Sequence, residues 1–271
     1  MKTSNKIIFF DNGCRVCRAG ASLVSGTGIS DQLNPLQTIE KSMVCDLDKT
    51  RYCNEIAVLD KETKETRYGV KGMLWVLEER IGKIVNVFLW PPLYYSIDFL
   101  YHIFSYNRKM IAPVYGKVEN DCKPEFNWTY RLVYISLCVV ISVLVTFWMG
   151  ESLSHLTWFK MNGLAMLLFA GTGWITHIIM FPLFRIPEKM EYLGHLCTVM
   201  LSGILLQVPF LIYCSVFGVN EMLLLFSLVL SDVLMIYMHF KRTKYLNISN
   251  SVSFAWWFTL HITAFVSLLF N

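Results

Sequence analysis

The chain has 271 residues, of which 55% are apolar and 16% charged, and its formal net charge is +4. Soluble domains are about 45–50% apolar and about 25% charged, so this composition excludes a disordered chain and disfavours a wholly soluble one. The weak charge gives no basis for nucleic-acid binding, and eight cysteines are too sparse for a small disulfide scaffold.

A pair of cysteines follows the first predicted strand. The strand covers residues 7–10, and Asp11-Asn12-Gly13 is a turn signal directly after it. Cys14-Arg15-Val16-Cys17 comes next, and residues 18–24 continue as a helix. The sequence therefore predicts a C-x-x-C motif between a strand and the start of a helix.

The remainder of the N-terminal part predicts a small α/β domain. Further strands are expected over 32–37, 55–60 and 66–68, and residues 70–81 have helical periodicity. This order fits a thioredoxin-like sheet. The apolar stretch 85–104 is split by Pro91-Pro92 and interrupted by Asp98, so we expect two soluble or interfacial helices there, with no membrane span.

The position of the cysteine pair favours thiol chemistry. A cysteine at a helix N-terminus faces unpaired N–H groups and the positive end of the helix dipole, and both stabilise its thiolate. Arg15 and Arg18 add positive charge nearby. Cys14 is then the nucleophile that attacks a disulfide, and Cys17 resolves the mixed disulfide. Asp11 either accepts a proton or caps the turn.

Other interpretations of the cysteines stay open. Structural zinc would need a second C-x-x-C knuckle, and the pair can also be purely structural or vestigial. Cys45 and Cys53 are either inert core thiols or a second relay pair. Three further cysteines fall in apolar segments and are interpreted as packing residues: Cys138, Cys197 and Cys214.

The segment from Asp11 to Cys17 resembles the signature of the DCC family of thiol-disulfide oxidoreductases, Asp-Gly-x-Cys-x-x-Cys after a short strand. Further resemblances lie at 34–37 (Asn-Pro-Leu-Gln), 68–72 (Tyr-Gly-Val-Lys-Gly) and 106–108 (Tyr-Asn-Arg). The resemblance covers about residues 1–112 and implies a thioredoxin-like fold with dithiol redox chemistry. Two departures are Asn12 for glycine and Lys71 for the usual Ser or Ala. The cis-proline general in thioredoxin-like enzymes is missing, and Tyr52-Cys53-Asn54 occupies its place.

Five apolar stretches after residue 128 are long enough to cross a bilayer as helices. The sequence predicts a domain over 1–112, a linker over 113–128 and an all-α transmembrane bundle of about five helices over 129–271. The predicted spans are 129–149, 162–184, 191–217, 220–240 and 252–270.

The distribution of basic residues predicts the orientation of these spans. With five spans, nearly all the flanking Lys and Arg fall on one side, so the positive-inside rule places the N-terminal domain in the cytoplasm and the C-terminus outside. Lys6 is followed by four apolar residues only, so we expect no secretory signal. A bacterial inner membrane is the expected location. The residues are Lys109, Lys117, Lys123, Arg131, Arg185, Lys189, Lys241, Arg242 and Lys244.

Ionisable residues inside the spans are the only chemical signal in the C-terminal part. His177, Asp232 and His261 are candidates for a quinone or haem site or for a proton path, because such residues usually face a bundle interior or a cavity. The alternative is hydrogen bonding between helices, above all for His195 and His239 near helix ends. Asp232 with a histidine partner is the pair most worth testing.

The sequence thus predicts a thiol-disulfide oxidoreductase anchored in a lipid bilayer, with Cys14, Cys17 and Asp11 at its site. Its partner would be a protein or small molecule that carries a thiol or disulfide. Two alternatives are a redox-sensing or docking module on a transporter-like or receptor-like bundle, and electron transfer to a quinone or haem in the membrane part.

Overall fold

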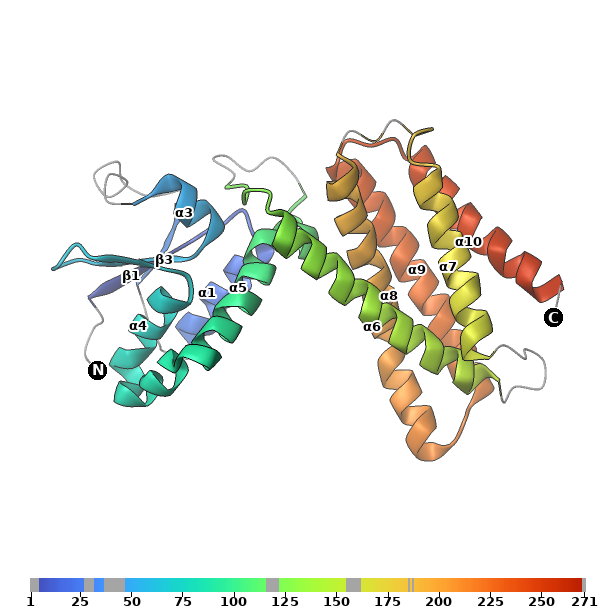
Figure 1. The fold of residues 1–271 in the computed structure, drawn as a ribbon, viewed down its shortest axis with the longest axis horizontal. Helices are drawn as coiled ribbons and strands as arrows, with labels where there is room; N and C mark the ends of the chain where they lie inside the picture. Colours follow the sequence, from blue (N-terminus) through green and yellow to red (C-terminus); the bar gives the residue numbers. More distant parts are fainter. Residues whose placement is uncertain are drawn as a thin grey trace. The chain divides into compact units, whose positions relative to one another are not determined.

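The computed structural model describes residues 5–26, 32–36, 47–115, 122–154, 162–184, 186 and 188–269 (Figure 1). The chain divides into two compact units, Met1–Val133 and Tyr134–Asn271. Several residues used above lie outside the described ranges, among them Gln37, Cys45, Lys117 and Arg185.

The first unit contains a four-stranded mixed sheet. Its strands are β1 (Lys6–Phe10), β2 (Leu33–Pro35), β3 (Ala57–Asp60) and β4 (Thr66–Tyr68), in the order β2-β1-β3-β4. β1 pairs in parallel with β2 and antiparallel with β3, which pairs antiparallel with β4. As a central strand, β1 is buried on both faces: Ile7 and Phe9 pack into one cluster and Ile8 into another.

Within the described residues, the helical segments that accompany this sheet are α1 (Arg15–Gly26), α3 (Lys49–Asn54), α4 (Gly69–Ile81), the 3-10 helix η2 (Gly82–Leu89) and α5 (Pro91–Ile111). The α4 helix packs closely on the sheet at Gly72, where an added Cβ would lie 2.8 Å from the Arg67 carbonyl oxygen and 3.0 Å from a Val58 methyl group. Only glycine permits this approach without movement of the backbone.

The small sheet and its helices agree with the sequence patterns, within one or two residues at most ends. The predicted strands correspond to β1–β4, and the predicted helix over 70–81 to α4. The Pro91-Pro92 break also separates η2 from α5, as expected. α3 was not predicted, because its six residues are too short to carry a helical period.

The second unit consists of helices: α6 (Trp128–Leu153), which begins in the first unit, α7 (Gly163–Ile179), α8 (Lys189–Phe217), α9 (Glu221–Tyr245) and α10 (Ser251–Leu269). Helices occupy all five predicted spans. Within the described residues, α6, α8 and α9 are long and apolar enough to cross a membrane, and α7 is a shorter apolar helix. The chain therefore has the character of a membrane protein.

We predict that Gly72→Ala destabilises the first unit by about 1–3 kcal/mol, because the new methyl group overpacks against the backbone of Arg67. Gly20→Ala is the matched control, since it lies in the helix α1 and an added Cβ there meets nothing within 4 Å. It should be neutral or stabilise by up to about 1 kcal/mol. Thermal unfolding of both full-length variants in detergent measures the difference, and equal melting temperatures would contradict this account of the packing.

Candidate active site

The turn between β1 and α1 holds the cysteine pair. The Gly13 N–H donates to Asp11 Oδ1 at 2.8 Å, and the Cys14 N–H donates to the Asp11 carbonyl oxygen at 3.1 Å. These two bonds close the turn, and α1 begins at Arg15. Asp11 therefore caps the turn, one of the two roles expected from the sequence.

Cys14 and Cys17 are free thiols held against each other. The backbone N–H of Cys17 donates to Cys14 Sγ at 3.3 Å, as expected for a sulfur at the open end of a helix. Cys14 is only 1% exposed, whereas Cys17 is partly exposed. The structure brings together all three predicted residues, Asp11, Cys14 and Cys17, and it covers the sulfur predicted to be the nucleophile.

The surroundings lower the pKa of the Cys14 thiol and raise the pKa of the Cys17 thiol. Hydrogen bonds from the side chain and the backbone N–H of Cys17, with the Arg108 charge, lower the pKa of Cys14 to about 6 against the opposing effect of burial. The hydrogen bond that Cys17 gives to Cys14, together with burial, raises the pKa of Cys17 far above its usual range. At neutral pH Cys14 is therefore a thiolate and Cys17 a thiol.

The positive charge at the site comes from Arg108, which lies on α5. Its Nη2 lies 3.4 Å from Asp11 Oδ2 and donates to the carbonyl oxygens of Cys53 at 2.9 Å and Cys122 at 3.3 Å. The predicted sources, Arg15 and Arg18, are both exposed, and the Arg15 guanidinium lies over the Tyr115 ring. Arg108 was not predicted as a site residue, although it ends the Tyr-Asn-Arg segment that resembles the DCC family.

Cys53 forms a disulfide with Cys122 across 69 residues, which the sequence analysis did not foresee. It expected Cys53 to be an inert thiol or to pair with Cys45. Hydrogen bonds next to the disulfide show why the two segments meet: Asn54 Oδ1 accepts from the Glu125 N–H at 2.8 Å, and Asn54 Nδ2 lies 3.4 Å from Glu125 Oε2. Neither of the two roles expected for Cys53 includes Cys122 as its partner.

A cavity of about 200 Å³ lies beside the cysteine pair. Cys17 lines it together with Asp11 and Arg108, while most of the remaining wall is apolar. Arg108 is 5% exposed, and its Nε has no hydrogen-bond partner among the described residues. The cavity therefore offers an apolar wall next to Cys17. The apolar side chains include Phe9, Val16, Ile56, Met73 and Phe104.

In the second unit, His177 belongs to a buried polar network between helices. The Tyr192 hydroxyl is hydrogen-bonded to His177 Nε2 at 2.8 Å and to His239 Nε2 at 2.9 Å. A hydroxyl has one proton to donate, so at least one of these two rings donates to it. His239 Nδ1 continues the network to Ser253 at 2.8 Å. This agrees with the alternative interpretation, hydrogen bonding between helices, and separates His177 from the other two candidates.

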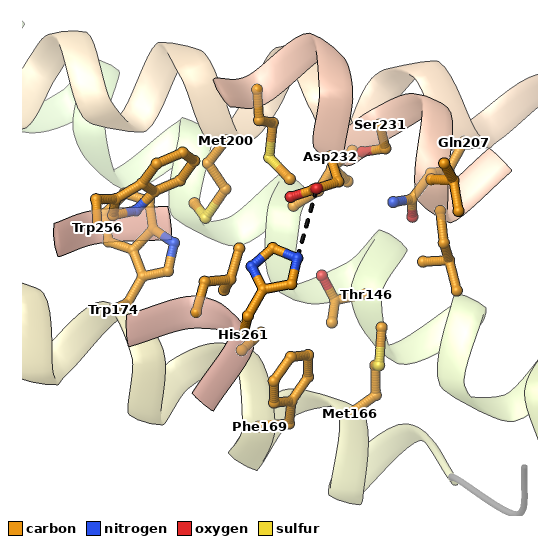
Figure 2. A pocket seen from close by; sticks show the side chains of 16 residues that line it. Thr146, Met166, Phe169, Trp174, Met200, Gln207, Ser231, Asp232, Trp256 and His261 are labelled. Carbon is orange, nitrogen blue, oxygen red and sulfur yellow. Dashed lines mark ion pairs between the residues drawn. The ribbon is translucent and has the colours of Figure 1, made fainter. Parts of the chain in front are cut away.

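Asp232 and His261 face each other across 3.5 Å in a separate cavity of about 340 Å³ (Figure 2). The Trp257 indole N–H donates to Asp232 Oδ2 at 3.3 Å, and His261 Nδ1 is hydrogen-bonded to the Trp257 carbonyl oxygen at 2.8 Å. Trp174 and Trp256 form one end of this cavity, and Gln207 lies toward the other (Figure 2). The pair that the sequence singled out is thus placed in an apolar cavity with a few polar groups.

No group of three or more His, Cys, Asp or Glu residues that could hold a metal ion occurs within the described part of the chain. A haem at His261 would need a ring nitrogen directed at the iron. Both of its nitrogens already have partners, Asp232 and the Trp257 carbonyl. The cavity therefore suits an organic ligand better than a haem.

The sequence matches no protein-family model. Comparisons with curated proteins and with solved structures likewise find no match. What the chain does must therefore be inferred from its own residues.

We predict that alkylation of Cys14 by iodoacetamide rises with pH around a midpoint near pH 6, because the thiolate is the reacting form. Arg108→Gln should raise this midpoint, because it removes a charge that favours the thiolate while the hydrogen bonds from Cys17 remain. Arg18→Gln is the matched control and should leave the midpoint in place. Mass spectrometry of the Cys14 peptide follows the reaction, and an identical midpoint in all three proteins would refute the role given to Arg108.

Proposed function

We propose that the protein is a membrane-bound thiol-disulfide oxidoreductase with Cys14 as its nucleophile and Cys17 as its resolving thiol. The observation that carries this proposal is the pairing itself: the Cys17 N–H donates to Cys14 Sγ at the start of α1, and a buried cation acts on the same sulfur. A thiolate at neutral pH next to a protonated thiol is the starting state that dithiol exchange requires.

The reaction proceeds in two exchanges. The Cys14 thiolate attacks one sulfur of a substrate disulfide, the substrate S–S bond breaks, and the other substrate sulfur leaves as a thiolate that takes up a proton. Cys17 then loses its proton and attacks Cys14 Sγ, which releases the second substrate thiol and leaves a Cys14–Cys17 disulfide. Two electrons pass to the substrate, and an external thiol donor returns the pair to the dithiol.

Asp11 acts here as a positioning residue. One carboxylate oxygen accepts the Gly13 N–H and the other faces Arg108, so both oxygens already have partners. We assign it the task of holding the turn and the guanidinium, in preference to accepting a proton.

The proposed fold of the first unit is thioredoxin-like. A central strand with one parallel and one antiparallel neighbour, and a C-x-x-C at the start of the helix after that strand, support this assignment. The resemblance of residues 11–17 to the DCC family points in the same direction.

We further propose that the first unit faces the cytoplasm of a bacterial cell and the C-terminus lies outside. The short connection between α8 and α9 makes these helices antiparallel, so Lys189 lies at the same end as Lys241 and Lys244. The Tyr134 hydroxyl near the start of α6 is hydrogen-bonded to Thr198 in the first part of α8, so α6 also begins at this end. Basic residues thus gather at one end of the bundle, as the positive-inside rule requires of the cytoplasmic side.

A second candidate function, quinone binding in the second unit, is favoured by the cavity of Figure 2. A quinone ring has two apolar faces that suit Trp174 and Trp256, and carbonyl oxygens that can accept from the side-chain amide of Gln207. Asp232 holds the imidazole of His261 at the wall of this cavity.

We predict that Cys14→Ser lowers the reduction of oxidised glutathione by at least about 100-fold, because the nucleophile is lost. Cys17→Ser should instead accumulate a mixed disulfide between Cys14 and glutathione, visible as a mass increase that dithiothreitol reverses. Cys138→Ser lies outside the site and is the control with unchanged activity. Wild-type rates in the Cys14→Ser variant would reject the proposed function.

We predict that ubiquinone-1 quenches the tryptophan fluorescence of the full chain in detergent, because two indoles line the cavity. Gln207→Leu should weaken this binding by about 10-fold, since it removes the side-chain donor to the quinone carbonyl. Glu221→Gln, at the start of α9 and outside the cavity, is the control. Equal quenching curves for the two variants would argue against quinone binding at this site.

A further inference from the structure

The Cys53–Cys122 disulfide belongs to the same residue cluster as the Cys14–Cys17 pair. The single atom Nη2 of Arg108 contacts the carbonyl oxygens of both disulfide residues and lies against the Asp11 carboxylate. Asp11 in turn closes the turn that carries Cys14. One guanidinium thus connects a disulfide and a dithiol that come from three separate parts of the sequence.

The exposure of these residues favours a partner from within the chain. Cys14 is 1% exposed, so a bulky protein disulfide cannot reach its sulfur without displacing the groups that cover it. Cys122 is 5% exposed, so its side of the disulfide is also poorly accessible to external thiols. Cys53 is partly exposed, so small thiols can approach the disulfide from that side, whereas the buried Cys14 thiolate can exchange with this disulfide more readily than with large external partners.

We propose that Cys53–Cys122 is a second redox centre that exchanges electrons with the Cys14–Cys17 dithiol. This inference rests on the proposed function, because it needs Cys14 as a nucleophile. The sequence analysis left open a relay role for Cys53 with Cys45 as its partner. The proposal keeps the relay role, with Cys122 as the partner.

The exchange between the two cysteine pairs conserves bonds and electrons without an external reactant. The Cys14 thiolate attacks one sulfur of Cys53–Cys122, that S–S bond breaks, and the other sulfur leaves as a thiolate. Cys17 loses its proton and attacks Cys14 Sγ, so that a Cys14–Cys17 disulfide forms and Cys53 and Cys122 end as two thiols. Two electrons move from the first pair to the second. The Arg108 guanidinium lies beside both centres and stabilises the thiolates formed on the way.

The exchange also has a structural consequence. The disulfide fastens residue 122, ahead of α6, to the last turn of α3, and the Asn54–Glu125 hydrogen bonds reinforce the attachment. Reduction removes the covalent part of this attachment and leaves the hydrogen bonds. The redox state of Cys14 and Cys17 is thereby coupled to how the segment before α6 is held.

The trapping experiment uses the full-length Cys17→Ser variant in detergent micelles. Without the resolving thiol, Cys14 should remain bonded to Cys53 or Cys122, and the other member of that pair should be free. Blocking with N-ethylmaleimide, digestion and mass spectrometry should find the cross-linked peptide. The matched control is the double variant Cys14→Ser/Cys17→Ser, in which the cross-link should be lost and Cys53–Cys122 should be intact.

A rate measurement covers the case in which the cross-link is short-lived. Dithiothreitol should reduce Cys53–Cys122 in the wild type through Cys14 and Cys17, and Cys14→Ser should slow this reduction by about 10-fold or more. A purely structural disulfide would be reduced at equal rates in both proteins.

The outcomes separate this inference from the proposed function. If Cys17→Ser traps glutathione on Cys14, no internal cross-link forms and the reduction rates are equal, the second redox centre is refuted and the oxidoreductase proposal stands. If Cys14 traps neither glutathione nor the internal disulfide, both proposals fail. An internal cross-link together with the slower reduction supports both.

Discussion

The buried guanidinium of Arg108 is the interaction on which the candidate site depends. A buried cation is costly unless it is paired and its N–H groups have acceptors. Here a single nitrogen meets the Asp11 carboxylate and the carbonyl oxygens of Cys53 and Cys122. Because these groups belong to the β1–α1 turn, the end of α3 and the segment before α6, the need to satisfy one charge fixes three parts of the first unit around the cysteine pair.

The charges of this cluster also explain why the thiolate is reactive. With Cys14 ionised, the cluster contains two negative groups, Cys14 and Asp11, and one positive group, Arg108. The hydrogen bonds from Cys17 and the guanidinium still outweigh the burial that opposes the thiolate. A disulfide between Cys14 and Cys17 removes the thiolate and leaves a neutral Asp11–Arg108 pair. Because the net effect of these surroundings is to stabilise the thiolate, they favour the reduced pair over the Cys14–Cys17 disulfide.

The sequence predicted what depends on local pattern. A short apolar run and turn signals located the strands, Pro91-Pro92 located a helix break, and the motif at 11–17 located the cysteine pair. It could not predict Arg108, which lies 97 residues from Asp11, or the partner of Cys53 at a separation of 69. Hydrophobic periodicity locates single helices and strands and does not predict contacts between residues so far apart in the sequence. The pairing of cysteines cannot be deduced from their spacing. Asp232 was recognised as a residue in need of a partner, but the rotation of each helix decided that the partner is His261.

The polar residues of the second unit form two groups. One group links helices by hydrogen bonds, and the other borders a cavity that could bind a ligand. His177, Tyr192, His239 and Ser253 form a buried chain of hydrogen bonds that stabilises contacts between helices, although His177 Nδ1 has no hydrogen-bond partner among the described residues. Asp232 and His261 are only partly buried and border a cavity. Ionisable groups inside membrane helices are costly, so a pair that lies beside a cavity is a stronger indication of a binding site than a chain packed between helices.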